Sequence, residues 1–187
     1  MHKKFLPTCL MAVVIPLTAV TGCTASGEGE GGTQTREDCC WKSEASFAEV
    51  ADVIGLPVPA AAGDRRAGYK QGERYDVGIL TFLLPEKAAG EFLRKLIPSG
   101  TRMVPNANPD PNNPYTLGAS FTHLGVPEPE VAKSVSMVSL CPEGQLNGVQ
   151  DPPILRKLKH CVKVYEYRDS SVGVRIYVRA GLEGVQE

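Results

Sequence analysis

The sequence predicts an α+β fold with a mainly antiparallel sheet, two helices packed on one face, and two disulfides that staple the domain. Three observations support this prediction. Two segments repeat apolar residues at helical spacing, several others alternate apolar and polar residues as strands do, and four cysteines lie within residues 39–187. Antiparallel strands of this kind bury one face and leave the other polar.

The first predicted helix begins after a capping box at Ser46–Glu49, in which a serine and a glutamate three residues later satisfy backbone donors reciprocally. Gly55 and Pro57 end it. Between the capping box and Gly55, apolar residues recur on one side of the predicted helix: Phe47, Val50, Ala51 and Ile54. We expect a short amphipathic helix, followed by a connection that contains glycine and arginine.

Tyr75–Leu84 is apolar on both alternating faces, which predicts a buried central strand. Pro85 is expected at the first position of a second helix, which Pro98 and Gly100 end. The buried stripe of this helix is formed by Ala89, Phe92, Leu93 and Leu96. The prolines of residues 105–114 then predict an exposed loop.

Three further strands are predicted at Lys133–Leu140, His160–Tyr167 and Val172–Arg179, with Arg168–Ser171 as the hairpin connection between the last two. The last strand has the clearest alternation. Its valines and isoleucine are expected to face the core, and the face that carries Arg175, Tyr177 and Arg179 is expected to meet water.

The N-terminus is typical of an export signal. Four residues that include two lysines precede the apolar run Phe5–Val20, which is too short to span a bilayer. Val20–Cys23 resembles the lipobox of bacterial lipoproteins, with an aliphatic residue, two small residues and a cysteine. The resemblance implies cleavage before Cys23, a diacylglycerol on its sulfur, usually an acylated amino terminus, and anchoring at the extracytoplasmic face of the cell membrane. An ordinary secreted protein cleaved near Gly22 is the alternative.

Elsewhere the chain resembles only uncharacterised lipoproteins of actinobacterial composition, a likeness that implies no active site.

The predicted organisation is therefore a signal peptide at residues 1–22, a lipidated N-terminus and flexible linker at 23–38, and one α+β domain at 39–187. The chain carries 20 basic and 21 acidic residues, a balance that gives no reason to expect nucleic acid as a partner. No residue pattern indicates a cofactor.

The four cysteines of the domain suggest disulfides, because an extracytoplasmic compartment is oxidising. A bond between the adjacent Cys39 and Cys40 would need a strained ring. Each is therefore expected to bridge to Cys141 or Cys161, in either order. Such loops of roughly 100 residues would each contribute up to about 4 to 5 kcal/mol in the chain-entropy model. A metal site is disfavoured because no C-x-x-C spacing or histidine pair is present.

Candidate catalytic residues are few. Gly118-x-Ser120 with His123 begins like a nucleophile elbow, but Thr122 stands where the elbow requires glycine, which favours a polar loop. Glu128 and Glu130 alternate with prolines and are expected to be solvated on an exposed stretch, where carboxylates are poor general acids.

Two surface features have binding interpretations. The basic residues Arg156, Lys157, Lys159 and Lys163 could contact anionic lipid or wall polymer, or be simply solvated. Asn106, Asn108, Asp110 and Asn112 offer oxygen ligands for calcium, although the intervening prolines favour a plain surface loop. The leading hypothesis is a lipid-anchored, non-catalytic binding or assembly domain at the cell envelope. The alternatives are an envelope hydrolase with a dispersed active site and a small-ligand sensor.

Overall fold

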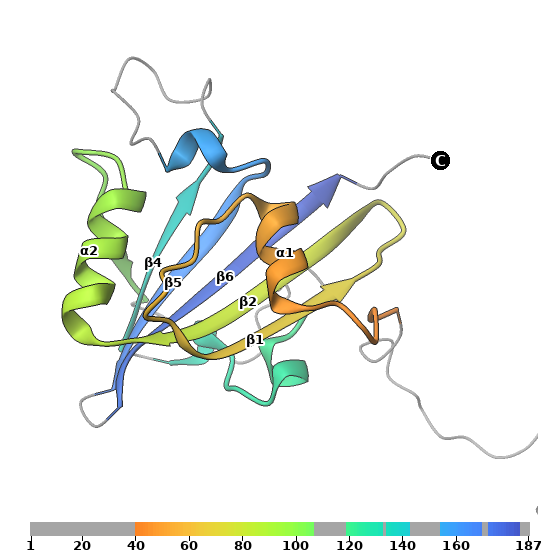
Figure 1. Ribbon diagram of the computed structural model, residues 1–187, viewed down its shortest axis with the longest axis horizontal. Helices are drawn as coiled ribbons and strands as arrows, with labels where there is room; N and C mark the ends of the chain where they lie inside the picture. The colour runs from red at the N-terminus through yellow and green to blue at the C-terminus, as the bar shows by residue number, and fades with distance from the viewer. Residues whose placement is uncertain (1–39, 107–118, 133, 143–153, 170–171, 184–187) are drawn as a thin grey trace, which may run out of the picture. The chain divides into compact units, whose positions relative to one another are not determined.

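The computed structural model describes residues 40–106, 119–132, 134–142, 154–169 and 172–183, and within these ranges a six-stranded antiparallel sheet forms the centre of the fold (Figure 1). The strands lie in the order β1-β2-β6-β5-β4-β3. Their bounds are β1 Gly63–Lys70, β2 Tyr75–Leu84, β3 Val104–Pro105, β4 Val135–Leu140, β5 Val162–Asp169 and β6 Gly173–Glu183. The predicted α+β class and mainly antiparallel sheet are confirmed.

Both predicted helices are present, α1 at Phe47–Ile54 and α2 at Glu86–Leu96. The capping box forms as expected: the Glu49 N–H donates to Ser46 Oγ at 3.2 Å, and the Ser46 N–H donates to Glu49 Oε2 at 2.8 Å. Gly55 ends α1 in the left-handed conformation, with φ at 77°. Pro85 is the residue before α2 rather than its first helical residue, a difference of one position.

One face of the sheet carries both helices and the larger apolar core. In Figure 1, α1 lies across β1 and β2, while α2 packs beside β2 and β6. Phe82 of β2 is fully buried and makes edge-to-face contacts with Phe47 of the α1 side and Phe92 of α2, with ring centroids 6.2 and 5.8 Å apart. The alternate residues of β6, including Ile176 and Val178, complete this core. The apolar sides predicted for the two helices are therefore the surfaces that pack on this face of the sheet.

The opposite face of the sheet is also covered, contrary to the expectation that it would meet water. Tyr177 and Arg179 of β6 are 3% and 1% exposed. The cover is the segment 119–132, which we call the cover segment; it contains two 3-10 turns, η1 at Phe121–Leu124 and η2 at Pro129–Val131. It buries Phe121 against Tyr177, with ring centroids 5.1 Å apart. Strand alternation could not reveal a cover made of irregular chain.

The bounds of β2 are those predicted, the bounds of β4, β5 and β6 differ from the predicted ones by up to four residues, and two strands were missed. β1 (Gly63–Lys70) was taken for a connection because it is an edge strand with mixed residues and few buried positions. β3 contains only two residues and pairs with β4 at Met137 and Ser136. A third 3-10 turn, η3 (Leu155–Lys157), precedes β5. Edge strands bury little apolar surface, so their sequence pattern is weak.

The disulfide connectivity differs from the prediction. The described residues contain one complete disulfide, Cys141–Cys161, at a sequence separation of 20. Leu140 pairs with Val162 at the end of β4 and the start of β5, so the two cysteines occupy the next opposing positions. Cys40 is disulfide-bonded as well.

A bridge from Cys40 to Cys141 or Cys161 was wrong for a geometric reason. The backbone of Cys40 is hydrogen-bonded to the end of β1, through Gln71 N–H at 2.8 Å, and β1 lies four strands away from β4. At about 4.8 Å per strand this separation is near 20 Å, far beyond the Cα–Cα distance that a disulfide spans.

Candidate functional site

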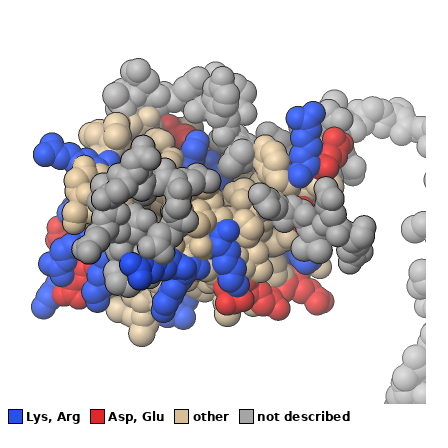
Figure 2. Space-filling view, turned by 90° about the horizontal axis from the view of Figure 1, so that it is seen from above, with Lys and Arg blue, Asp and Glu red and all other residues tan. Residues whose placement is uncertain are grey.

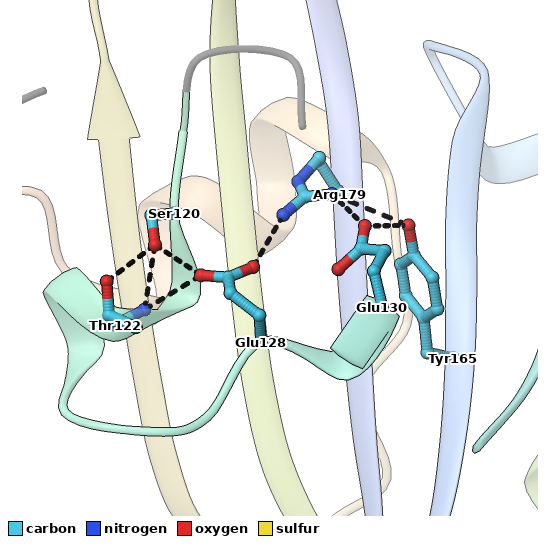
Figure 3. Close-up of polar contacts among 6 residues, drawn as sticks. All are labelled: Ser120, Thr122, Glu128, Glu130, Tyr165 and Arg179. Carbon is cyan, nitrogen blue, oxygen red and sulfur yellow. Dashed lines mark hydrogen bonds and ion pairs between the residues drawn. The ribbon is translucent and has the colours of Figure 1, made fainter. Parts of the chain in front are cut away.

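A buried charge cluster holds the cover segment on the sheet. The side chain of Arg179, on β6, has no exposed surface and reaches two glutamates of the cover segment (Figure 3). Its Nη2 donates to Glu128 Oε2 at 3.1 Å, and its Nη1 donates to Glu130 Oε1. The glutamate side chains are only 15% and 13% exposed. The prediction that these two carboxylates are solvated is therefore wrong, because the short loop returns them to the sheet.

Neighbouring residues add further hydrogen bonds to this cluster (Figure 3). The Tyr165 hydroxyl of β5 donates to Glu130 Oε1. Burial, and then the charge of Glu130, raises the pKa of Tyr165 well above its ordinary value, so this hydroxyl is a donor at neutral pH. Glu128 Oε1 accepts from the Ser120 hydroxyl and, at 3.0 Å, from the Thr122 N–H.

The cluster fastens the chain rather than exposing reactive groups. Two carboxylates share one guanidinium, and a buried charge is tolerated only when it is paired and hydrogen-bonded. The Arg179 guanidinium also lies over the Phe121 ring, 4.9 Å from its centroid. A second arginine, Arg66 of β1, donates to the carbonyl oxygens of Leu124 and Gly125 at 2.9 and 3.2 Å. The cover segment is thus tied to β6, β5 and β1.

Ser120 and His123 face different partners, so the geometry does not assemble a nucleophile and base. Ser120 caps η1, accepting from the Thr122 N–H at 3.2 Å, and directs its hydroxyl to Glu128. The His123 ring instead stacks on Trp41, with ring centroids 3.9 Å apart and planes 3° from parallel. Their positions agree with the polar-loop interpretation.

Trp41 lies between the cover segment and the chain that enters the domain. Its ring lies against β1 where Gly68 leaves room: a Cβ added at Gly68 would stand 2.7 Å from Trp41 Cζ3. Residue 41 also pairs with Lys70, and the Lys42 N–H donates to the Tyr69 carbonyl at 2.8 Å. The chain that enters the domain is therefore fixed beside β1.

A cleft of about 570 Å³ opens between this entering chain, helix α1 and strand β1. Val50 and Val53 of α1 and the ring of Tyr69 give it apolar walls, and residues 41–45 form its remaining side. Its volume is within the range of small-molecule sites. It is the candidate binding site of the described chain.

The charges of the cleft come from three side chains. Lys42 Nζ lies over the Tyr69 ring, 4.7 Å from its centroid. Hydrogen bonds from Ser46, followed by the charge of Lys42, hold the pKa of Glu49 below its ordinary value. Glu44 is exposed at the rim.

Tyr69 is held rigidly as one wall of the cleft. Its hydroxyl donates to Asp76 Oδ2 at 2.5 Å. Burial, and then this hydrogen bond, raises the pKa of Tyr69 to about 12, so the hydroxyl stays protonated at physiological pH.

The basic residues predicted to contact the envelope lie near η3 and in β5. Arg156, Lys157 and Lys159 are exposed near η3, while Lys163 is half-buried within β5. Lys159 Nζ pairs with Asp52 Oδ2 of α1 at 3.4 Å. On the face seen in Figure 2, basic side chains stand among acidic ones. The η3 segment packs on the end of α1, where the Lys159 N–H donates to the Ile54 carbonyl at 3.0 Å.

Several predicted positions lie outside the described residues: Cys23, Cys39, Asn108, Asp110 and Asn112. Asn106 is described, and its Nδ2 donates to the carbonyl oxygen of Glu130 at 2.6 Å. Its side chain therefore braces η2. Within the described ranges, no helix has the length and apolar character needed to cross a membrane.

Sequence reasoning missed Arg179, Tyr165, Trp41 and Tyr69. A signal for Arg179 was present, since a glutamate pair between prolines and an arginine in a strongly alternating strand are complementary charges. Nothing in the sequence connected residues that lie 49 and 51 positions apart.

Comparison with known proteins gives no relative for this chain: no family model, no curated protein and no solved structure matches it. The functional argument therefore depends on the residues and their geometry.

Proposed function

We propose that this chain is a lipid-anchored extracytoplasmic protein that binds a component of the cell envelope in the cleft beside α1, without chemistry of its own. The observation that carries the proposal is the cleft itself, an apolar-walled opening of about 570 Å³. Ser120 and His123, the residues of the elbow-like motif, are engaged in structural contacts in the cover segment, which supports binding over hydrolysis.

The position of the cleft in the sequence supports the anchored role. Its first lining residue, Trp41, is eighteen positions after the lipobox cysteine Cys23. A flexible chain of that length has an end-to-end distance of about 25 Å. Lipid on Cys23 would therefore keep the cleft close to the membrane surface, where envelope components are concentrated.

The anchor is tested by the intact mass of the protein recovered from membranes. The wild-type chain is expected to begin at Cys23 with the added mass of diacylglycerol, and to leave the membrane fraction when Cys23 is replaced by alanine. Recovery of an unlipidated wild-type chain in the soluble fraction would contradict the anchored role.

The binding role is tested by a photo-crosslinking amino acid at position 53, in the cleft, and at position 73, in the exposed turn after β1. A discrete product is expected in intact cells from position 53 alone, and it should diminish in the Cys23→Ala background. Equal labelling from both positions, or labelling from neither, would count against the cleft.

A further inference from the structure

The disulfide between Cys141 and Cys161 closes a loop that supports helix α1. The described part of this loop contains η3 and lies against the C-terminal end of α1. The Lys159 N–H donates to the Ile54 carbonyl at 3.0 Å, which satisfies one of the carbonyls that a helix leaves unpaired at its end. Lys159 Nζ also pairs with Asp52 Oδ2 at 3.4 Å. Because Lys159 is two positions before Cys161, the disulfide fixes the chain beside both contacts.

The packing between η3 and α1 is close. Gly55, the residue that ends α1, faces the backbone of η3, and a Cβ added at Gly55 would stand 1.9 Å from the Lys157 carbonyl oxygen. Leu155 and Leu158 are buried in the same apolar core as Ile54. Since little space separates the two segments, the position of α1 depends on that of η3.

Helix α1 is in turn one wall of the cleft, which its residues Glu49, Val50 and Val53 line. The disulfide is therefore connected to the cleft through two packed elements, η3 and α1. A change at the disulfide that freed η3 would act on the cleft without any direct contact between them.

The disulfide is accessible to a reductant. Cys161 is exposed and Cys141 is half-buried. Exposed disulfides are among those that reductants open most easily and that serve regulation. Every residue of β4 is paired with β5, so the sheet remains joined when the bond opens. Opening therefore acts on the loop and η3 rather than on the sheet.

We propose that the Cys141–Cys161 disulfide is a redox switch for the cleft. A dithiol reductant opens the bond, η3 is released from the end of α1, and the wall that α1 provides loosens. The oxidised protein is therefore the form that binds. The switch rests on the proposed function in one respect, namely that the cleft is a binding site.

The reaction is an ordinary thiol–disulfide exchange. A thiolate of the reductant attacks Cys161 Sγ, the S–S bond breaks, and Cys141 Sγ leaves as a thiolate and takes up a proton. The second thiol of the reductant then displaces Cys161 Sγ from the mixed disulfide. The reductant ends as a disulfide, and the protein holds two thiols.

The coupling to α1 is tested with the double variant Cys141→Ser/Cys161→Ser, which represents the reduced state. Amide hydrogen exchange is measured on the lipidated protein in an uncharged maltoside detergent. The amides of residues 50–55 should accelerate about tenfold more than those of β2 and β6, the change in a local opening equilibrium that corresponds to losing one hydrogen bond and one exposed ion pair. Leu96→Ala, which lowers stability through α2, is the matched control and should show no such excess at α1.

The reduction is tested on the wild-type protein with dithiothreitol, followed by alkylation of the free thiols and peptide mapping. Cys141 and Cys161 are expected to become alkylated while the amides of β2 and β6 stay protected, and exchange in α1 should rise with the alkylated fraction. A bond that opens only when the sheet unfolds would overturn the proposal.

The remaining outcomes separate the switch from the proposed function. If the α1 amides of the double variant gain no more than those of β2 and β6, η3 does not hold α1 and the switch is wrong. Crosslinking from position 53 should fall in the double variant, and an unchanged yield would overturn the switch while the cleft remains a binding site. If position 53 gives no product even in the wild-type background, the proposed function fails, and the exchange measurement decides whether the disulfide governs α1.

Discussion

The two faces of the sheet are closed in different ways. On one face, amphipathic helices bury an apolar core that includes Phe82, Leu96 and Ile176. On the other, the irregular cover segment is held by directed polar contacts from Arg179 and Arg66. A helix satisfies its own backbone and needs only an apolar stripe to dock. An irregular segment has fewer internal hydrogen bonds, so side chains must both satisfy its groups and fix its orientation.

The largest effect is expected from Arg179→Met, which removes the cation from the face of the sheet that the cover segment closes. We call this face the polar face, and the face that carries α1 and α2 the helical face. Glu128 and Glu130 would remain largely buried without it, and breaking such a pair costs about 3 to 5 kcal/mol. The free energy of unfolding, measured with urea, should fall by this amount.

Adding Glu128→Gln and Glu130→Gln to the Arg179→Met variant should restore much of that loss, because the buried charges are then neutral. A loss below about 1 kcal/mol for Arg179→Met alone would show that the cluster does not hold the cover segment.

Leu96→Ala on the helical face is expected to cost about 3 kcal/mol, since Leu96 is fully buried and the substitution leaves a cavity. The two glutamine substitutions should not reduce this cost, in contrast to their effect on Arg179→Met. If the two glutamine substitutions restored the unfolding free energy of Leu96→Ala as much as that of Arg179→Met in the same urea experiment, the two faces would not be held by different kinds of contact.

Ser120→Ala should destabilise the protein by about 1 kcal/mol. It removes one donor to Glu128 and the cap of η1, while the Thr122 N–H still binds the same carboxylate oxygen. Thr101→Ala, at an exposed position after α2, provides a comparison in thermal unfolding. A cost near zero would indicate that the hydrogen bond from the Thr122 N–H alone is sufficient to hold Glu128.

The smallest effect concerns tyrosine ionisation. The pKa of Tyr69 in the folded protein is about 12, above the ordinary value of 10.0. Folding therefore favours the protonated hydroxyl, and this contribution to stability is complete below pH 10 and is lost as the pH rises through 12. Tyr69→Phe should make the decline in unfolding free energy between pH 10 and 12 shallower, by less than about 0.5 kcal/mol per pH unit, because solvent screens this partly exposed hydroxyl.

Tyr165, on the polar face, is more deeply buried and its pKa is raised further. Absorbance at 295 nm should therefore show Tyr69 ionising before Tyr165 as the pH rises. The reverse order, established with the two phenylalanine variants, would contradict the relative burial of the two faces.

The sequence predicted the helical face well because its information is local. A capping box, a glycine at the helix end and apolar residues at helical spacing together defined α1, and the stripe of α2 proved to be its buried surface. Tyr75–Leu84 was predicted with its observed bounds as a central strand. Each of these sequence signals is contained in a stretch of about ten residues.

The polar face and the cleft could not be predicted in this way. Arg179 meets Glu128 and Glu130 from about fifty positions away, and an arginine that alternates with valine is typical of a solvated strand face. The cleft joins residues 41–45 to α1 and β1, and β1 itself was missed. Contacts between distant segments leave no periodic pattern in the chain.

The disulfide between Cys141 and Cys161 also bears on the response of the protein to proteolysis. It joins the end of β4 to the start of β5, and every residue of β4 is already paired with β5. A protease that cuts once between the two cysteines would leave fragments connected covalently and by the sheet. The nicked protein would migrate as one band on a non-reducing gel and as two after reduction, so a protease could cut this stretch without releasing either half of the domain.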